Sequence, residues 1–88
     1  MSLAMLFDGR GISVRKNAKA IRQALRWSDR VEISGWPIHI ANFSSDARDE
    51  VNVYDGRRVH QPEKVFEPAQ VDQAIERFLE LVREVQEN

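Results

Sequence analysis

The sequence predicts an α+β fold, a small two-layer domain in which an antiparallel sheet is packed by helices. Three observations predict it. Apolar residues follow the helical period over 68–87 and again over 13–27, and between these segments the chain alternates apolar and polar residues as strands do. With 88 residues the chain is about one domain long, so we expect 1–88 to fold as a single domain.

The first predicted strand covers residues 3–7 and ends at Asp8-Gly9, a turn signal because glycine accepts positive φ. Two continuations stay open after this turn. Residues 12–14 return as the second strand of a hairpin, or a helix starts at Ser13, a good N-cap residue. We take the helix as 13–27, because apolar residues recur there at the helical period. They are Val14, Ala18, Ile21 and Leu25.

Two hairpins are predicted between the helices. Alternation that begins at Arg30, stops at Ser34-Gly35 and resumes over 37–43 predicts a hairpin over 30–43. Two strand-like runs around Asp55-Gly56 predict a second hairpin over 50–60. The pattern aromatic-Asp-Gly-Arg stands at both 7–10 and 54–57, which we attribute to a need for the same turn at both places.

The last helix is predicted over 68–87, with Pro68 in its first turn, where a missing N–H costs nothing. Its apolar residues cover roughly 160° of the helical wheel, which favours packing on a sheet over the narrower seam of a coiled coil. These residues are Val71, Ala74, Ile75, Phe78, Leu79, Leu81, Val82 and Val85.

Composition excludes several classes of site. The chain has no cysteine, so it forms no disulfide, thiolate metal site or cysteine nucleophile. No apolar run approaches the ~18 residues of a membrane span, and no signal peptide opens the chain. We therefore expect a cytoplasmic protein without a membrane partner.

Charge is uneven along the chain. Residues 1–30 carry seven basic and two acidic groups, whereas 31–88 carry six basic and twelve acidic ones. Part of the basic excess forms a row along the predicted helix 13–27, at the spacing i, i+4, i+7 and i+11. The row consists of Arg15, Lys19, Arg22 and Arg26. It is a candidate nucleic-acid-binding surface, and the alternatives are an acidic protein partner or an ordinary solvated helix face.

Two tryptophans are candidate protein-binding residues. Trp27 lies off the apolar stripe of its helix, and tryptophan is common in interface hot spots. Trp36, with Phe43 and Tyr54, either forms an aromatic patch for a partner or belongs to the core.

No catalytic or metal-binding constellation is found. His39 and His60 lack the spacing of a zinc site, and the acidic residues between 46 and 50 lack the spacing of a calcium loop. We expect no enzyme activity, cofactor or small-molecule ligand. The sequence favours a non-catalytic protein-interaction or regulatory module, self-associating as a homodimer. A nucleic-acid-binding protein is the alternative, and a small enzyme or enzyme subunit the third.

Overall fold

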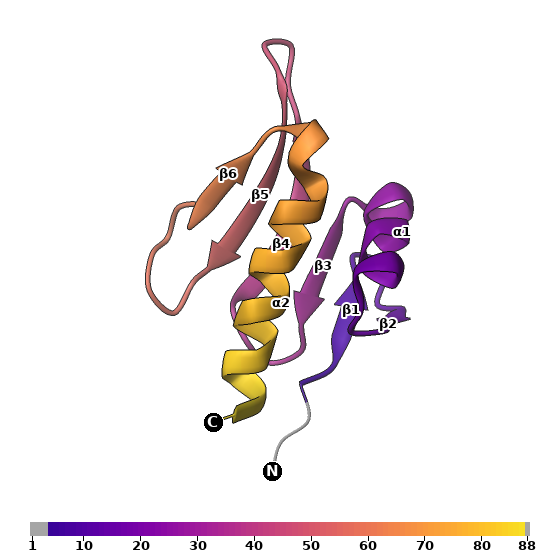
Figure 1. The fold of residues 1–88 in the computed structure, drawn as a ribbon, viewed down its shortest axis with the longest axis vertical. Helices are drawn as coiled ribbons and strands as arrows, with labels where there is room; N and C mark the ends of the chain where they lie inside the picture. The colour runs from indigo at the N-terminus through magenta and orange to yellow at the C-terminus, as the bar shows by residue number, and fades with distance from the viewer. Residues whose placement is uncertain (1–3, 88) are drawn as a thin grey trace.

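The chain folds into one antiparallel sheet with two helices on the same face, in a computed structural model that describes residues 4–87 (Figure 1). The strand order is β2-β1-β3-β4-β5-β6. The strands are β1 (Leu6–Asp8), β2 (Ser13–Val14), β3 (Arg30–Ile33), β4 (Ile38–Ser44), β5 (Asp49–Asp55) and β6 (Lys64–Phe66). The helices are α1 (Ala18–Ser28) and α2 (Val71–Glu87), preceded by a 3₁₀ turn, η1 (Pro68–Gln70). The predicted α+β two-layer domain is confirmed.

Residues 13–14, after the Asp8-Gly9 turn, form a strand of a hairpin and not the start of a helix. Val14 pairs with Leu6, so residues 13–14 form the edge strand β2, and the predicted helix start at Ser13 is wrong. The helix begins at Ala18 because Asn17 caps it, its Oδ1 accepting from the N–H of Ala20 at 2.9 Å. Leu3, part of the predicted strand 3–7, lies outside the described residues.

The hairpin predicted over 30–43 is confirmed as β3 and β4, joined at a turn in which Gly35 has φ 78°. The hairpin predicted over 50–60 is wrong in its second strand. Residues 57–60 form no strand, and β5 pairs instead with β6 after a loop through 56–63. The Asp55 carboxylate accepts hydrogen bonds from the backbone N–H and the guanidinium of Arg57. These bonds form a turn that directs the chain out of the sheet.

The core lies between the sheet and the helices. The predicted helix 68–87 is confirmed as η1 followed by α2, which packs on β4, β5 and β6, while α1 packs on β1, β2 and β3. Phe78 of α2 is fully buried, as are Ile21 of α1 and Ile40 of β4. The molecule measures 43 × 26 × 20 Å. A shortest dimension of 20 Å is that of two layers spaced about 10 Å apart.

Candidate interaction surfaces

The sheet has one face without helices, which we call the open face. The fully buried row Val31, Ile40 and Val53 lies beneath the helices, so the residues that alternate with these face the other way. Cross-strand pairing arranges them in rows. One row is Phe7, Glu32, His39 and Tyr54; the next is Arg30, Ala41, Asn52 and Val65; Phe43 and Glu50 follow.

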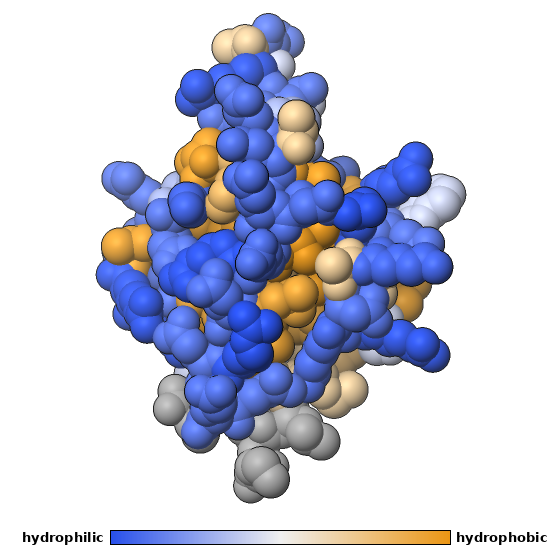
Figure 2. Space-filling view, viewed as in Figure 1, coloured by the Kyte–Doolittle hydropathy of each residue, from blue (hydrophilic) through white to orange (hydrophobic). Residues whose placement is uncertain are grey.

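The open face exposes apolar side chains. Among the described residues, Met5 is 53% exposed, Phe43 51% and Val65 50%. Met5 shares this face with Phe7 because it also alternates with the buried Leu6. The helix side differs: Figure 2 shows it as mostly hydrophilic, with apolar atoms gathered in the seam between α2 and α1. Phe43 and Val65 lie two strands apart in neighbouring rows, and exposed apolar groups on one face are typical of interaction surfaces.

An aromatic stack occupies the middle of the open face. The rings of His39 and Tyr54, cross-strand neighbours on β4 and β5, lie 4.3 Å apart and nearly parallel. Burial lowers the pKa of His39 below its ordinary value, although nearby Glu32 raises it, and Arg30 lowers it further. The imidazole is therefore neutral at pH 7 and behaves as part of the aromatic surface.

Asn52 is the polar residue at the centre of the open face, and it is already buried. Its Nδ2 donates to the hydroxyl of Tyr54 at 3.3 Å, and its Oδ1 has no partner among the described residues. Covering this face would therefore add little desolvation cost at Asn52, because water has already been excluded from it.

The open face carries charges of both signs. Arg30 and Glu32 are two residues apart on β3, and neither makes an ion pair within residues 4–87. Arg48 and Glu50, by contrast, pair with each other at 2.8 Å. The charges of these four residues thus balance.

The basic row predicted for nucleic acid does not form as a continuous helical row. Arg15 precedes the helix, which starts only at Ala18, and Arg22 forms an ion pair with Asp72 of α2. Lys19 and Arg26 remain on α1 without an ion pair within the described residues. Arg22 thus connects α1 to α2 and is not available to a ligand, so the basic row is shorter than predicted.

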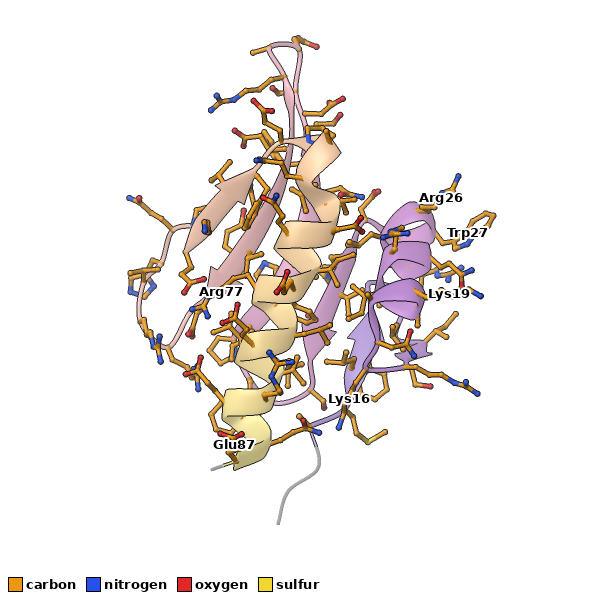
Figure 3. All side chains as sticks on the ribbon, viewed as in Figure 1. Lys16, Lys19, Arg26, Trp27, Arg77 and Glu87 are labelled. Atoms are coloured by element: carbon orange, nitrogen blue, oxygen red, sulfur yellow. The ribbon has the colours of Figure 1, made fainter. Side chains whose placement is uncertain are left out.

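The two predicted tryptophans have different surroundings. Trp27 is 75% exposed on α1, and its side chain points away from α2 (Figure 3). Trp36 is 37% exposed in the turn between β3 and β4, and the guanidinium of Arg57 lies over its ring at 5.8 Å. Trp36 thus has a partner within the chain, whereas the indole of Trp27 lies largely in solvent.

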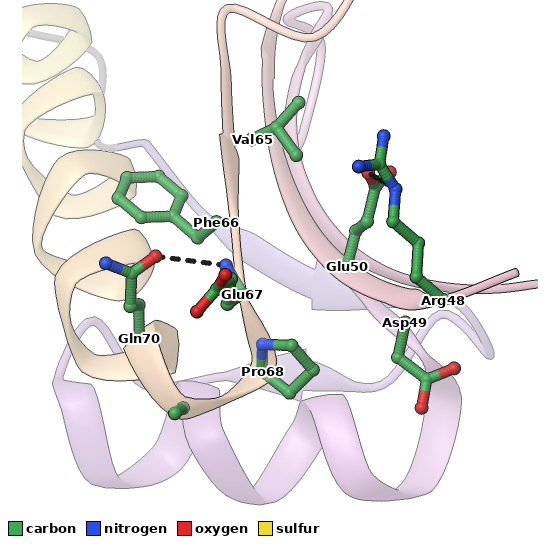
Figure 4. A pocket seen from close by; sticks show the side chains of 9 residues that line it. Arg48, Asp49, Glu50, Val65, Phe66, Glu67, Pro68 and Gln70 are labelled. Atoms are coloured by element: carbon green, nitrogen blue, oxygen red, sulfur yellow. Dashed lines mark hydrogen bonds and ion pairs between the residues drawn. The ribbon is translucent and has the colours of Figure 1, made fainter.

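A groove of about 750 Å³ lies where β6 leads into η1 (Figure 4). Its polar groups already satisfy one another. Arg48 pairs with Glu50, and Gln70 accepts from the N–H of Glu67 at 3.1 Å in a capping box. The start of the helix accounts for this arrangement without a ligand.

The described residues contain no group of three or more His, Asp or Glu that could hold a metal ion. Neither helix in the described part of the chain combines the length and apolar composition needed to cross a membrane. A scan against models of known protein families and searches of curated proteins and of solved structures find no match to this chain.

Sequence reasoning named Phe43 and Tyr54 as patch residues but missed Met5 and Val65. Both belong to short strand-like runs whose alternation is too brief to show which side faces the core. Val65 reaches the open face because β6 pairs with the middle of β5, a pairing that the Asp55-Gly56 turn signal obscured.

Proposed function

We propose that this chain is a non-catalytic protein-interaction module that self-associates through its open face. The observation that carries the proposal is that half-exposed apolar side chains, Met5, Phe43 and Val65, are spread over a sheet face that both helices leave free. Two such faces can pack against each other as in a β-sandwich, where facing sheets lie about 10 Å apart.

The size of the face supports a second copy as the partner. The six strands contain 26 residues, which at ~3.3 Å per residue and ~4.8 Å between strands give a projected area of about 400 Å². Side-chain relief adds accessible area to this projection. The face is therefore at the small end of the ~800 Å² that each partner buries in a standard interface, which fits a dimer that forms at high concentration.

The charges support a symmetric arrangement. In a two-fold dimer each patch meets its own copy, so opposite charges must lie at positions that the axis exchanges. An axis that crosses β3 between Arg30 and Glu32 would place each Glu32 over Arg30 of the other copy. Both charges lack an ion pair in the described chain, so each is free to make this contact.

Light scattering coupled to size exclusion tests the proposal. At high micromolar concentration we expect twice the chain mass of 10.2 kDa. Val65→Glu should give the monomer, because it introduces two unpaired carboxylates at the interface. Val59→Glu is the matched control, since Val59 is 44% exposed but lies in the loop 56–63. A monomeric wild type, or a monomer from the control as well, would overturn the proposal.

A charge exchange tests the position of the axis. Arg30→Glu and Glu32→Arg should each weaken the dimer, because each places like charges opposite one another. The double variant should restore it, since exchanging both residues recreates the opposite-charge pairs. A dimer that is insensitive to all three variants would place the axis elsewhere, while leaving the test at Val65 intact.

A further inference from the structure

The outer surface of α1 is not used by the proposed dimer, because α1 lies on the opposite side of the sheet from the open face. Its outermost side chain is Trp27, the most exposed large apolar residue in the described chain at 75%. Lys19, Gln23 and Trp27 follow at i, i+4 and i+8, and Arg26 lies beside Trp27. We call these four residues the Trp27 surface.

The Trp27 surface contains a hollow. Gln23, Arg26 and Trp27 line an open space of about 430 Å³. The indole forms an apolar wall, and the amide and guanidinium supply hydrogen-bond donors next to it. A planar, polar ring system stacked on the indole would fit this combination.

The charge of this surface is positive. Helix α1 contains no acidic residue, and Lys19 and Arg26 make no ion pair within residues 4–87. Asp72 of α2, which lies near α1, is already paired with Arg22. Asp29, which caps the end of the helix, is the acidic residue closest to Trp27 along the chain. Lys19 and Arg26 are thus available to an anionic ligand.

We infer that the Trp27 surface binds single-stranded nucleic acid. A base stacks on the indole of Trp27, Gln23 and Arg26 reach its edge, and Lys19 contacts the phosphate backbone. Single strands fit better than a duplex, because a duplex keeps its bases stacked on one another. A lipid surface fits less well, since the side chains around Trp27 are polar and offer no apolar patch to insert.

Fluorescence anisotropy with a labelled oligouridylate tests the inference. Trp27→Ala should weaken binding about fivefold or more, the lower end of what stacking on one base contributes. Trp27→Leu should weaken it as much, because leucine keeps the apolar bulk but has no aromatic face. Arg83→Gln on α2 is the control for the loss of one positive charge that makes no ion pair within residues 4–87, and it should bind like the wild type. Circular dichroism confirms that each variant is folded.

The salt dependence gives a second readout. With Lys19 and Arg26 as the two phosphate contacts, raising the salt from about 50 to 200 mM should weaken binding about sevenfold. Lys19→Gln should reduce this dependence, because it removes one of the two contacts.

Four results would overturn the inference. These are no binding at low salt, full binding by Trp27→Leu, equal affinity for a duplex of the same length, and retention on phosphatidylcholine–phosphatidylserine vesicles without binding to the oligonucleotide. The last result would instead identify a lipid surface.

Discussion

The segments 7–10 and 54–57 have the same pattern, aromatic-Asp-Gly-Arg, and the same local structure. In each, the aspartate ends a strand and is buried. Its carboxylate accepts from the backbone N–H of the arginine two residues later, at 2.8 Å for Asp8 and 3.1 Å for Asp55. The same arginine also donates to it through its guanidinium. We call these segments the first and the second Asp–Arg turn.

The surroundings of the two turns differ. Asp8 also accepts from the N–H of Ile12 at 3.0 Å, and this bond closes the β1–β2 hairpin. Asp55 instead faces Arg58, which binds Glu84 of α2 at 2.8 Å. The first turn therefore joins neighbours in sequence, whereas the second connects the end of β5 to the last helix.

The comparison separates local from tertiary effects. Four residues are sufficient for the Asp–Arg contact, because the arginine can reach back to a carboxylate two residues earlier. The partner beyond that contact depends on the element that packs nearby. In the first turn Arg10 is 53% exposed, and in the second Arg57 is only 21% exposed.

Acidification should have the largest effect on the free energy of unfolding, because low pH protonates the aspartates of both Asp–Arg turns. Hydrogen bonds from Arg57 lower the pKa of Asp55 against the effect of burial. Burial raises the pKa of Asp8, but hydrogen bonds from Ile12 and Arg10 outweigh it, so that pKa is also lowered. A lowered folded-state pKa means that the unfolded chain binds more protons, so this stability is complete above about pH 4 and is lost as the pH falls through the folded values.

Urea unfolding at a series of pH values measures this loss. The double variant Asp8→Asn with Asp55→Asn should be less stable at pH 7 and should lose less stability below pH 4 (about the ordinary pKa of a free aspartate). His39, with its lowered pKa, contributes a separate loss that begins near pH 6.5, its ordinary value. An unchanged acid dependence below about pH 4 in the double variant would contradict the assignment.

Removing one carboxylate at a time should show the difference between the turns. Asp55→Ala should cost about 3 kcal/mol, because it leaves the half-buried Arg57 with only the more distant carboxylate of Glu84, at 3.9 Å. Asp8→Ala should cost less, since water can solvate Arg10 in place of the carboxylate, and should selectively reduce hydrogen-exchange protection in β2. Equal losses of unfolding free energy would show that burial of the arginine does not distinguish the two turns.

Substituting the glycine of each Asp–Arg turn should also destabilise the second turn more than the first, but by a smaller margin. A Cβ on Gly56 would lie 2.8 Å from the Cβ of Pro37, a rigid ring, so Gly56→Ala should cost about 1–2 kcal/mol. A Cβ on Gly9 would lie 3.0 Å from the carbonyl oxygen of Ser28 and 3.4 Å from the flexible Arg30 side chain, so Gly9→Ala should cost less. Thermal unfolding of both variants measures which one loses more stability. A larger loss for Gly9→Ala than for Gly56→Ala would contradict this prediction.

Prediction from sequence succeeded where the pattern was long. The eight apolar positions of 68–87 identified α2, and six of them are fully buried. It failed where two local signals competed. Ser13 is a good N-cap, but Asn17 caps the helix, since pairing with Leu6 places Val14 in β2. Asp55-Gly56 is a hairpin signal, but the Asp–Arg contact and the N–H of Gly56 on the Pro37 carbonyl end β5 without returning it.

The candidate surfaces divide in the same way. The exposure of Trp27 was predicted from its position off the apolar stripe, because helical periodicity alone shows which side of a helix faces outward. The loss of Arg22 from the basic row could not be predicted, since its partner Asp72 is 50 residues away.

The sequence by itself determined the class of fold, the long helix and the two Asp–Arg turns, because each depends on contacts within a few residues. The tertiary structure alone decided that β5 pairs with β6, which charges are left without partners and which face stays uncovered. Those outcomes depend on side chains distant in sequence, and no local pattern specifies which of them meet.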